Sequence, residues 1–237
     1  MKLSVIAASA LITIAAFGEG VTSVESSNTF GVMKVSCSAQ KVIVCTPWVK
    51  ALTADAIQLK DLVMTAGLED GDAIILYKDG EFKGWSLNGD AWVGTPVSDV
   101  GGTVVTGVEE AITRGAGFWF VKKNFSADAP YDLYLYGQDT SAPAESTVVA
   151  NAYNLVANPT TASVNVVGKI ALAANGDSIQ IPGGILYTYN GTNWTYLKKE
   201  LVNGRNKVTA ATASEINIPA GQGFWYVSKG GAGTIAW

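Results

Sequence analysis

Histidine is absent from the sequence, and its absence limits the chemistry that this chain can perform. Ser-His-Asp and Cys-His nucleophile systems need an imidazole base, and almost every protein site for zinc or copper uses histidine ligands. Gly115-Ala116-Gly117 begins like a dinucleotide fingerprint, but Phe118 and Trp119 follow it and no βαβ context surrounds it. The sequence therefore predicts a protein that is not an enzyme and that has no cofactor or metal site.

Carboxylates are the remaining candidates for acid–base chemistry, because a pair of them can hydrolyse a glycosidic bond. The candidates lie beside glycine or in turn-like stretches: Glu69, Asp70, Asp72, Asp79, Glu81 and Asp90. Aspartate in such places commonly shapes a turn, and the second half of the chain keeps only Asp177, the counterpart of Asp72. The run at residues 69–72 also suggests calcium, but it lacks the spacing and the closing glutamate of an EF-hand loop. Turn geometry is the favoured interpretation, and a hydrolase without histidine remains an alternative.

The two cysteines, Cys37 and Cys45, lie close together in the sequence. A three-residue loop at residues 40–42 would place them opposite each other on neighbouring antiparallel strands. Because an exported chain reaches an oxidising compartment, we expect a disulfide between them, which would stabilise the fold by about 2–3 kcal/mol. A register slip of one residue would instead leave two free buried thiols on opposite faces.

Two Asn-Gly pairs between alternating apolar runs predict β-hairpins with two-residue type I′ turns, because both turn positions need φ > 0. A turn at Asn88-Gly89 places Trp85 opposite Trp92. A turn at Asn190-Gly191 places Tyr187 opposite Trp194. Both hairpins therefore set an aromatic pair at the same distance from the turn, where cross-strand pairs stabilise a sheet.

These four aromatic residues are the candidate ligand or interface residues: Trp85, Trp92, Tyr187 and Trp194. If exposed, they would form a platform on which the face of a sugar can stack. The larger apolar face of a hairpin is normally the buried one, so the core is their favoured location. A partly exposed strip that binds a glycan or another protomer is the alternative.

Four sequence blocks occur twice in the same order. They are Val44-Cys45-Thr46-Pro47 with Val156-Ala157-Asn158-Pro159, Gly71-Asp72-Ala73-Ile74 with Gly176-Asp177-Ser178-Ile179, Asn88-Gly89 with Asn190-Gly191, and residues 115–121 with residues 221–227. The offsets between the copies are 112, 105, 102 and 106 residues, as expected when insertions fall in loops. The sequence therefore predicts one architectural unit that is used twice.

The composition is typical of an all-β fold, because strands rich in Val, Ile, Tyr and Trp alternate with glycine-containing turns. We expect two tandem, mostly antiparallel, sandwich- or barrel-like β modules at residues 19–137 and 148–237. A polar linker at residues 138–147 joins them. One short helix is expected in the first module, because Leu59, Leu62, Val63 and Ala66 fall on one helical face and Gly67 can end it.

Residues 1–18 have the layout of a secretory signal peptide, with Lys2 before an apolar run and a small-x-small site at its end. The run is shorter than the ~20 residues that span a bilayer, so a membrane anchor is the less favoured alternative. We expect cleavage after Gly18 and a secreted or cell-surface protein. The net charge of −4 and the charged fraction of 15% indicate neither nucleic acid nor a membrane as a partner after cleavage.

The repeated blocks resemble modules of poorly characterised secreted bacterial proteins. In those modules a strand runs into an Asn-Pro or Thr-Pro corner, a Gly-Asp strand and an aromatic hairpin follow, and a G-x-G-[FY]-W strand closes the unit. The matching residues are Asn158-Pro159, Gly176-Asp177, Asn190-Gly191 and residues 221–225, with their first-copy counterparts. The resemblance covers most of the mature chain and implies a shared fold, but no activity.

The export signal, the missing histidine and the duplicated apolar strands together favour a non-enzymatic structural, adhesive or interaction protein of the cell exterior. Its expected partners are other protomers or surface glycan. A carbohydrate-binding module that uses the hairpin aromatics is the alternative.

Overall fold

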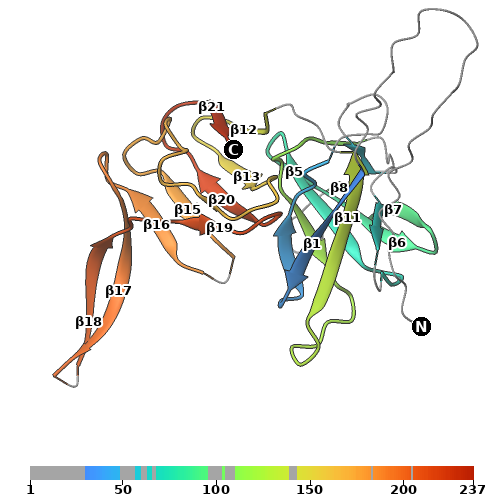
Figure 1. Cartoon of the computed structure of the whole chain (residues 1–237), viewed down its shortest axis with the longest axis horizontal. Coiled ribbons are helices and arrows are strands. Elements are labelled where there is room, and N and C mark those ends of the chain that lie inside the picture. The colour runs from blue at the N-terminus through green and yellow to red at the C-terminus, as the bar shows by residue number, and fades with distance from the viewer. Residues whose placement is uncertain are drawn as a thin grey trace, which may run out of the picture.

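The protein is described here by a computed structural model, which covers residues 30–48, 57–59, 63–65, 68–95, 103–104, 110–138, 143–182, 184–203 and 205–237. Strands are the regular elements of these residues, and the prediction of an all-β fold is confirmed (Figure 1). No helix in the described part of the chain is long and apolar enough to cross a lipid bilayer. The predicted signal peptide, residues 1–18, lies outside the described residues.

The described part of residues 30–138, the first half of the chain, contains two main sheets around one core and a small two-stranded sheet. Its strands are β1 (Phe30–Cys37), β2 (Lys41–Val44), β3 (Ile57–Gln58), β4 (Val63–Thr65), β5 (Ala73–Lys78), β6 (Glu81–Asn88), β7 (Ala91–Thr95), β8 (Thr103–Val104), β9 (Ala111–Ile112), β10 (Phe118–Val121) and β11 (Tyr131–Gln138). A larger sheet has the order β2-β10-β5-β6-β7, with β8 beside β6, and a smaller one has the order β1-β11-β4. Alternating side chains from both sheets, such as Val35, Leu133, Phe118 and Trp85, form one buried cluster between them.

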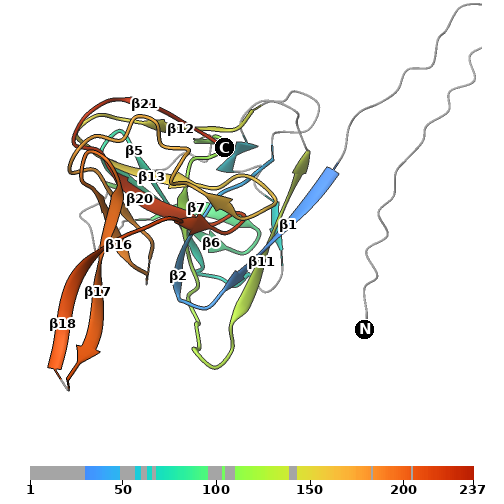
Figure 2. The same ribbon diagram turned by 60° about the vertical axis from the view of Figure 1, so that its left-hand side comes forward.

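The second half, residues 143–237, is built in the same way. Its strands are β12 (Glu145–Val148), β13 (Tyr153–Ala157), β14 (Val164–Asn165), β15 (Ser178–Gln180), β16 (Leu186–Tyr189), β17 (Trp194–Val202), β18 (Arg205–Thr212), β19 (Asn217–Ile218), β20 (Gly223–Val227) and β21 (Gly233–Ala236). The larger sheet has the order β13-β20-β15-β16-β17-β18, and β12 pairs with β21. Figure 2 shows β17 and β18 extending away from the rest of the molecule as a two-stranded arm.

The strand orders of the two halves correspond element by element. The strand order β2-β10-β5-β6-β7 in the large sheet of the first half matches the order β13-β20-β15-β16-β17 in that of the second. The pair β1-β11 matches β12-β21, and the pair β3-β9 matches β14-β19. In each pair the strands are antiparallel. β18 is an addition of the second half, since no described strand of the first half occupies the equivalent position.

The predicted hairpin between the cysteines is wrong. β1 pairs with β11 and β2 pairs with β10, so the chain passes from one sheet to the other at residues 38–40. Met33, Val35 and Cys37 on β1 and Val44 on β2 enter the same core from different sheets. Cys37 and Cys45 are free buried thiols, and the predicted disulfide is absent.

The predicted short helix is also wrong where the chain is described. Val63–Thr65 forms β4, which pairs antiparallel with β11 and places Met64 opposite Leu135. Leu59 is buried directly after β3, and its backbone N–H donates to the Glu110 carbonyl at 2.9 Å. Pairing with distant strands satisfies this backbone, so tertiary contacts override a short helical pattern. Leu62, Ala66 and Gly67, which completed the predicted helix, lie outside the described residues.

Both aromatic hairpins are formed, but each register is shifted by two residues. Leu87, not Trp85, lies opposite Trp92, and Tyr189, not Tyr187, lies opposite Trp194. Trp85 faces Gly94 and Tyr187 faces Tyr196 instead. Because the shift is even, every side chain keeps its predicted face of the sheet. The shift is the same in both halves, so the correspondence between the two hairpins remains.

Candidate functional site

The four aromatic residues predicted as ligand or interface residues belong to the cores. Trp85 and Trp194 are buried, each inside the core of its own half. Trp92 and Tyr187 are half-buried and pack against the same two cores. The Tyr189 and Tyr226 rings pack around Trp194, with centroids 5.2 and 6.5 Å away. Trp85 and Trp194 therefore offer no open ring face as a sugar platform.

The two thiols are poorly suited to nucleophilic chemistry. Burial raises the pKa of Cys37 to about 11, and the Cys37 thiol donates to the Val35 carbonyl at 3.5 Å. Burial also raises the pKa of Cys45, whose thiol donates to the Asn158 carbonyl of the second half at 3.3 Å. Both therefore stay protonated near neutral pH, and a thiol is a much weaker nucleophile than a thiolate.

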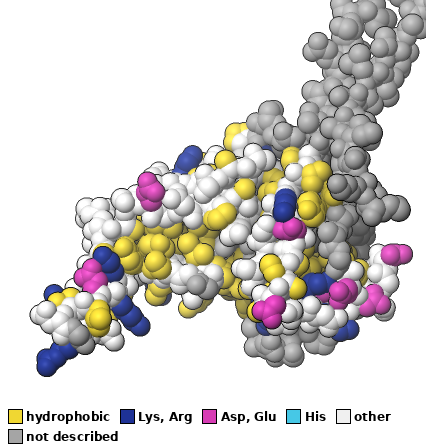
Figure 3. Space-filling view, turned by 60° about the horizontal axis from the view of Figure 1, so that its bottom comes forward, with side chains coloured by type: hydrophobic (Ala, Val, Ile, Leu, Met, Phe, Trp, Pro, Cys, Tyr) yellow, Lys and Arg dark blue, Asp and Glu magenta, His cyan; other side chains and the backbone are white. Residues whose placement is uncertain are grey.

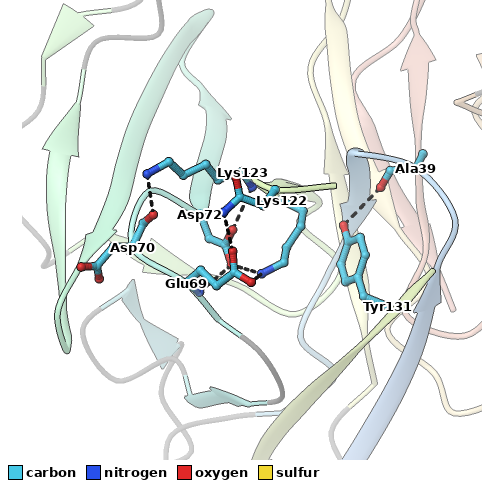
Figure 4. Close-up of polar contacts among 8 residues, drawn as sticks. Ala39, Glu69, Asp70, Asp72, Lys122, Lys123 and Tyr131 are labelled. Carbon is cyan, nitrogen blue, oxygen red and sulfur yellow. Dashed lines mark hydrogen bonds and ion pairs between the residues drawn. The ribbon is translucent and has the colours of Figure 1, made fainter. Parts of the chain in front are cut away.

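Asp72 is a buried anchor for the loop that precedes β5 (Figure 4). Its carboxylate accepts the backbone N–H of Glu69 at 2.9 Å and that of Lys123 at 2.8 Å. The Lys122 ammonium lies 2.8 Å from the Asp72 carboxylate and 3.5 Å from that of Glu69. Buried charges are stable when they are paired and hydrogen-bonded in this way. This carboxylate is thus fully engaged in joining the end of β10 to the start of β5.

Asp177 plays the same part in the second half with a different third partner. Its carboxylate accepts the backbone N–H of Ala174 at 2.9 Å and that of Lys229 at 2.6 Å. The Tyr226 hydroxyl donates to it where the first half has the Lys122 ammonium. Burial, together with this hydrogen bond, raises the pKa of Tyr226. The repeated Gly-Asp block is therefore a structural element in both halves.

The other carboxylates of the predicted acidic set do not form a metal site. Lys123 donates to the Asp70 carbonyl at 3.0 Å, and Asp70 accepts the backbone N–H of Gly89 at 2.8 Å. Asn124 donates to the Glu69 carboxylate at 2.8 Å. Within the described ranges, no group of three or more Cys, Asp or Glu side chains could hold a metal ion. The contacts of Glu69 and Asp70 hold turns in place.

The two halves meet through reciprocal backbone contacts. Val44 bridges Gln222, and their counterparts Val156 and Ala116 bridge each other. The Cys45 N–H donates to the Gly221 carbonyl at 3.0 Å, and the equivalent Ala157 N–H donates to the Gly115 carbonyl at 3.1 Å. Contacts that repeat with the partners exchanged are those of a two-fold, isologous interface, here within one chain.

The glycines of the repeated G-x-G block make this close approach possible. Gly115 and Gly221 have φ of +80° and +68°, a region that glycine adopts without strain. A Cβ on Gly223 would lie 2.3 Å from the Ile43 side chain, and one on Gly117 would lie 3.1 Å from both Ile43 and Leu155. The block therefore serves the junction between the halves, which sequence reasoning did not identify.

A second group of aromatic residues lies on the surface across the junction, and sequence reasoning missed it. This aromatic seam consists of Tyr77 and Phe82 from the first half and Tyr153 and Trp225 from the second. Trp225 is the central ring, with the centroids of Tyr77, Tyr153 and Phe82 at 5.3, 6.1 and 6.4 Å in edge-on arrangements. Tyr153 is 60% exposed. Only the apolar character of the G-[FY]-W strand on both faces hinted at a second packed surface.

A groove of about 300 Å³ also lies at the junction. Cys37, Lys41 and Ile43 line it from the first half, and Ile181, Pro182 and Gln222 line it from the second. None of the described residues that line the groove is a carboxylate.

The sequence matches no protein-family model, no curated protein and no solved structure.

Proposed function

We propose that this chain is a non-enzymatic structural or adhesive protein of the cell exterior, built from a duplicated β module. The main support is the reciprocal junction between the halves. The residues shared by the two copies serve turns, strand pairing and the contact between the modules. The glycines, turn aspartates and core aromatics that occur in both copies have roles in folding. Repetition of folding residues alone favours a structural role over a catalytic one.

Export is part of the same proposal. Residues 1–18 read as a signal peptide, and the mature chain would act at the cell surface or beyond. Other protomers of the same chain are the proposed partners. Duplicated modules with exposed strand edges suit repeated contacts between identical molecules.

Light scattering coupled to size-exclusion chromatography tests this function on the mature chain. Association that increases with protein concentration is the expected result. A monomer at every concentration contradicts a self-assembling structural role. Localisation is tested separately by fractionating the cells that produce the protein, with the mature chain expected outside the cytoplasm.

Glycan binding is the second candidate, and the exposed ring of Tyr153 beside Trp225 is the observation that favours it. A glycan array with the wild type and Tyr153→Ala tests this alternative. Binding that the substitution abolishes supports it. Leu197→Asn is a suitable control, because it also removes an exposed apolar side chain but lies away from the aromatic seam. If the wild type binds no glycan on the array, this alternative is wrong.

A further inference from the structure

We propose that the arm formed by β17 and β18 docks onto the first half of a second copy of this chain, so that copies join head to tail. The inference rests on the proposed structural role and names the contact that would carry it. Figure 3 shows the arm at the lower left of the molecule, with hydrophobic and basic side chains on its surface. The arm projects from the body of the second half in every view (Figures 1 and 2).

One face of the arm is apolar and open to solvent. Leu197 and Leu201 are 71% and 73% exposed, and Val208 on the neighbouring strand is more than half exposed. The register places Ala210 opposite Leu197 and Val208 opposite Lys199, so these side chains share one face. Leu186 on β16, also more than half exposed, extends the same face toward the body of the molecule. Lys199 also lies on this face, between the two leucines, so the face combines exposed aliphatic side chains with a basic one. Soluble monomers rarely leave a cluster of large aliphatic side chains uncovered.

This apolar face contributes nothing to the core of its own half. The core side of β17 carries Trp194, which is buried, and Tyr196, which packs against the core. Farther along the arm that side becomes charged: Lys198 pairs with Glu200 at 2.7 Å, and Lys207 lies opposite Glu200. The outer face therefore keeps Leu197, Leu201 and Val208 exposed around Lys199, along a length where the inner face carries charged pairs. A partner surface explains this pattern, and packing within the chain does not.

Charge indicates which surface the arm contacts. The arm carries four basic residues against one acidic residue: Lys198, Lys199, Arg205 and Lys207 against Glu200. Residues 30–138 contain thirteen acidic and nine basic residues, whereas residues 143–237 contain four acidic and six basic residues. A basic arm is attracted to the acidic first half of another copy and repelled by another arm. A contact between unlike surfaces is heterologous, so it generates a row of molecules that ends only if its rotation closes a ring.

The first experiment replaces the apolar face. Leu197→Asn combined with Leu201→Asn is compared with Val149→Asn, an exposed aliphatic residue of the second half that lies away from this face. Sedimentation velocity on the mature chain over a concentration series is the measurement, with circular dichroism as the test of folding. The wild type and the control are expected to associate. The arm variant is expected to raise the dissociation constant by at least about tenfold, since both leucines lose the area that they bury.

The second experiment tests the charge. Lys199→Glu combined with Lys207→Glu is compared with Lys169→Glu combined with Lys229→Glu, which changes the net charge equally outside the arm. Association is expected to weaken much more in the arm variant and to weaken with added salt in the wild type. Equal weakening in both variants overturns the role of the arm.

The third experiment determines the direction of the contact. Leu201→Cys is labelled with a photoactivatable maleimide, because both native thiols are buried. Cross-links to peptides of residues 30–138 of another copy are expected, and cross-links between two arms overturn the head-to-tail arrangement.

The outcomes distinguish this contact from the proposed function. If the wild type assembles and the double leucine variant assembles equally, the proposed arm contact is wrong and the proposed function stands. A wild type that remains monomeric at every concentration contradicts both the arm contact and the proposed function. A monomer that binds anionic vesicles through the two leucines shows a lipid partner and overturns the proposal.

Discussion

Asp72 and Asp177 show how one residue type keeps its role while its surroundings change. Each accepts two backbone N–H groups of its own half, but a lysine completes the first set and a tyrosine the second. The sequence indicated a turn role for both aspartates, because each follows a glycine. It gave no sign of the third partner, since Lys122 is 50 residues away from Asp72 and the pairing depends on β10 lying beside β5.

Exchanging the two arrangements tests this interpretation. Lys122→Ser copies Ser228 of the second half and is expected to lower the free energy of unfolding by about 3 kcal/mol, because it leaves the buried Asp72 carboxylate without its cation. Adding Phe120→Tyr, which copies Tyr226, is expected to recover part of the loss through a new hydroxyl donor. Urea unfolding measures both. Phe120→Tyr alone is the control and is expected to bring no gain in the free energy of unfolding. If the double variant is no more stable than Lys122→Ser, the two aspartate sites are not equivalent.

The state of the cysteines gives a second prediction at this scale. Without reductant, unfolded protein is expected to react with Ellman's reagent at two thiols, whereas folded protein at pH 8 reacts slowly. Burial and, for Cys37, a pKa of about 11 keep the thiolate scarce. The control is the same protein after treatment with a reductant, which is expected to give the same count. A higher count after reduction reveals a disulfide.

At the scale of elements, strands were easier to predict than their partners. The turn residues of both hairpins correctly indicated strands, because this signal is local. The hairpin registers were wrong by two residues because side chains reset the turns: Asp70 bonds to Gly89 in the first, and Asn190 caps its own loop in the second. The cysteine hairpin and the helix failed for a related reason, since β11 and β10 supplied partners from distant sequence.

The second turn can be tested directly. The Asn190 side chain accepts the N–H groups of Thr192 and Asn193 at 3.0 and 2.8 Å. Asn190→Ala is therefore expected to lower the free energy of unfolding by about 1 kcal/mol. Asn88→Ala at the equivalent position is the control and is expected to cost less, because the first turn uses Asp70 instead. Thermal unfolding measures both, and equal losses contradict this assignment.

On the scale of the whole molecule, the junction organises the fold. Repetition of four blocks allowed two related units to be predicted from sequence. How these units meet was not predictable, because the contacts combine residues more than 100 positions apart, such as Cys45 with Asn158. Only the neighbours of the G-x-G glycines in the other half show why a side chain does not fit there.

Gly223→Ala tests the junction. The added Cβ would meet the Ile43 side chain at 2.3 Å, so a loss of about 1–3 kcal/mol in unfolding free energy is expected. Gly168→Ala is the control, since nothing lies near its Cβ position. Adding Ile43→Ala to Gly223→Ala is expected to cost less than the sum of the two separate changes. Faster reaction of the Cys45 thiol in Gly223→Ala would show that the junction opens, and an unchanged rate and stability contradict a close fit.

The reciprocal junction has a further consequence for how the two modules behave on dilution. Two separate subunits joined by such an interface would come apart on dilution, as the chance of meeting again falls with concentration. Here both faces belong to one polypeptide, so the effective concentration of each for the other is set by the intervening chain and stays constant. The paired architecture therefore persists at any dilution, without any need to find a partner, as the proposed extracellular role requires.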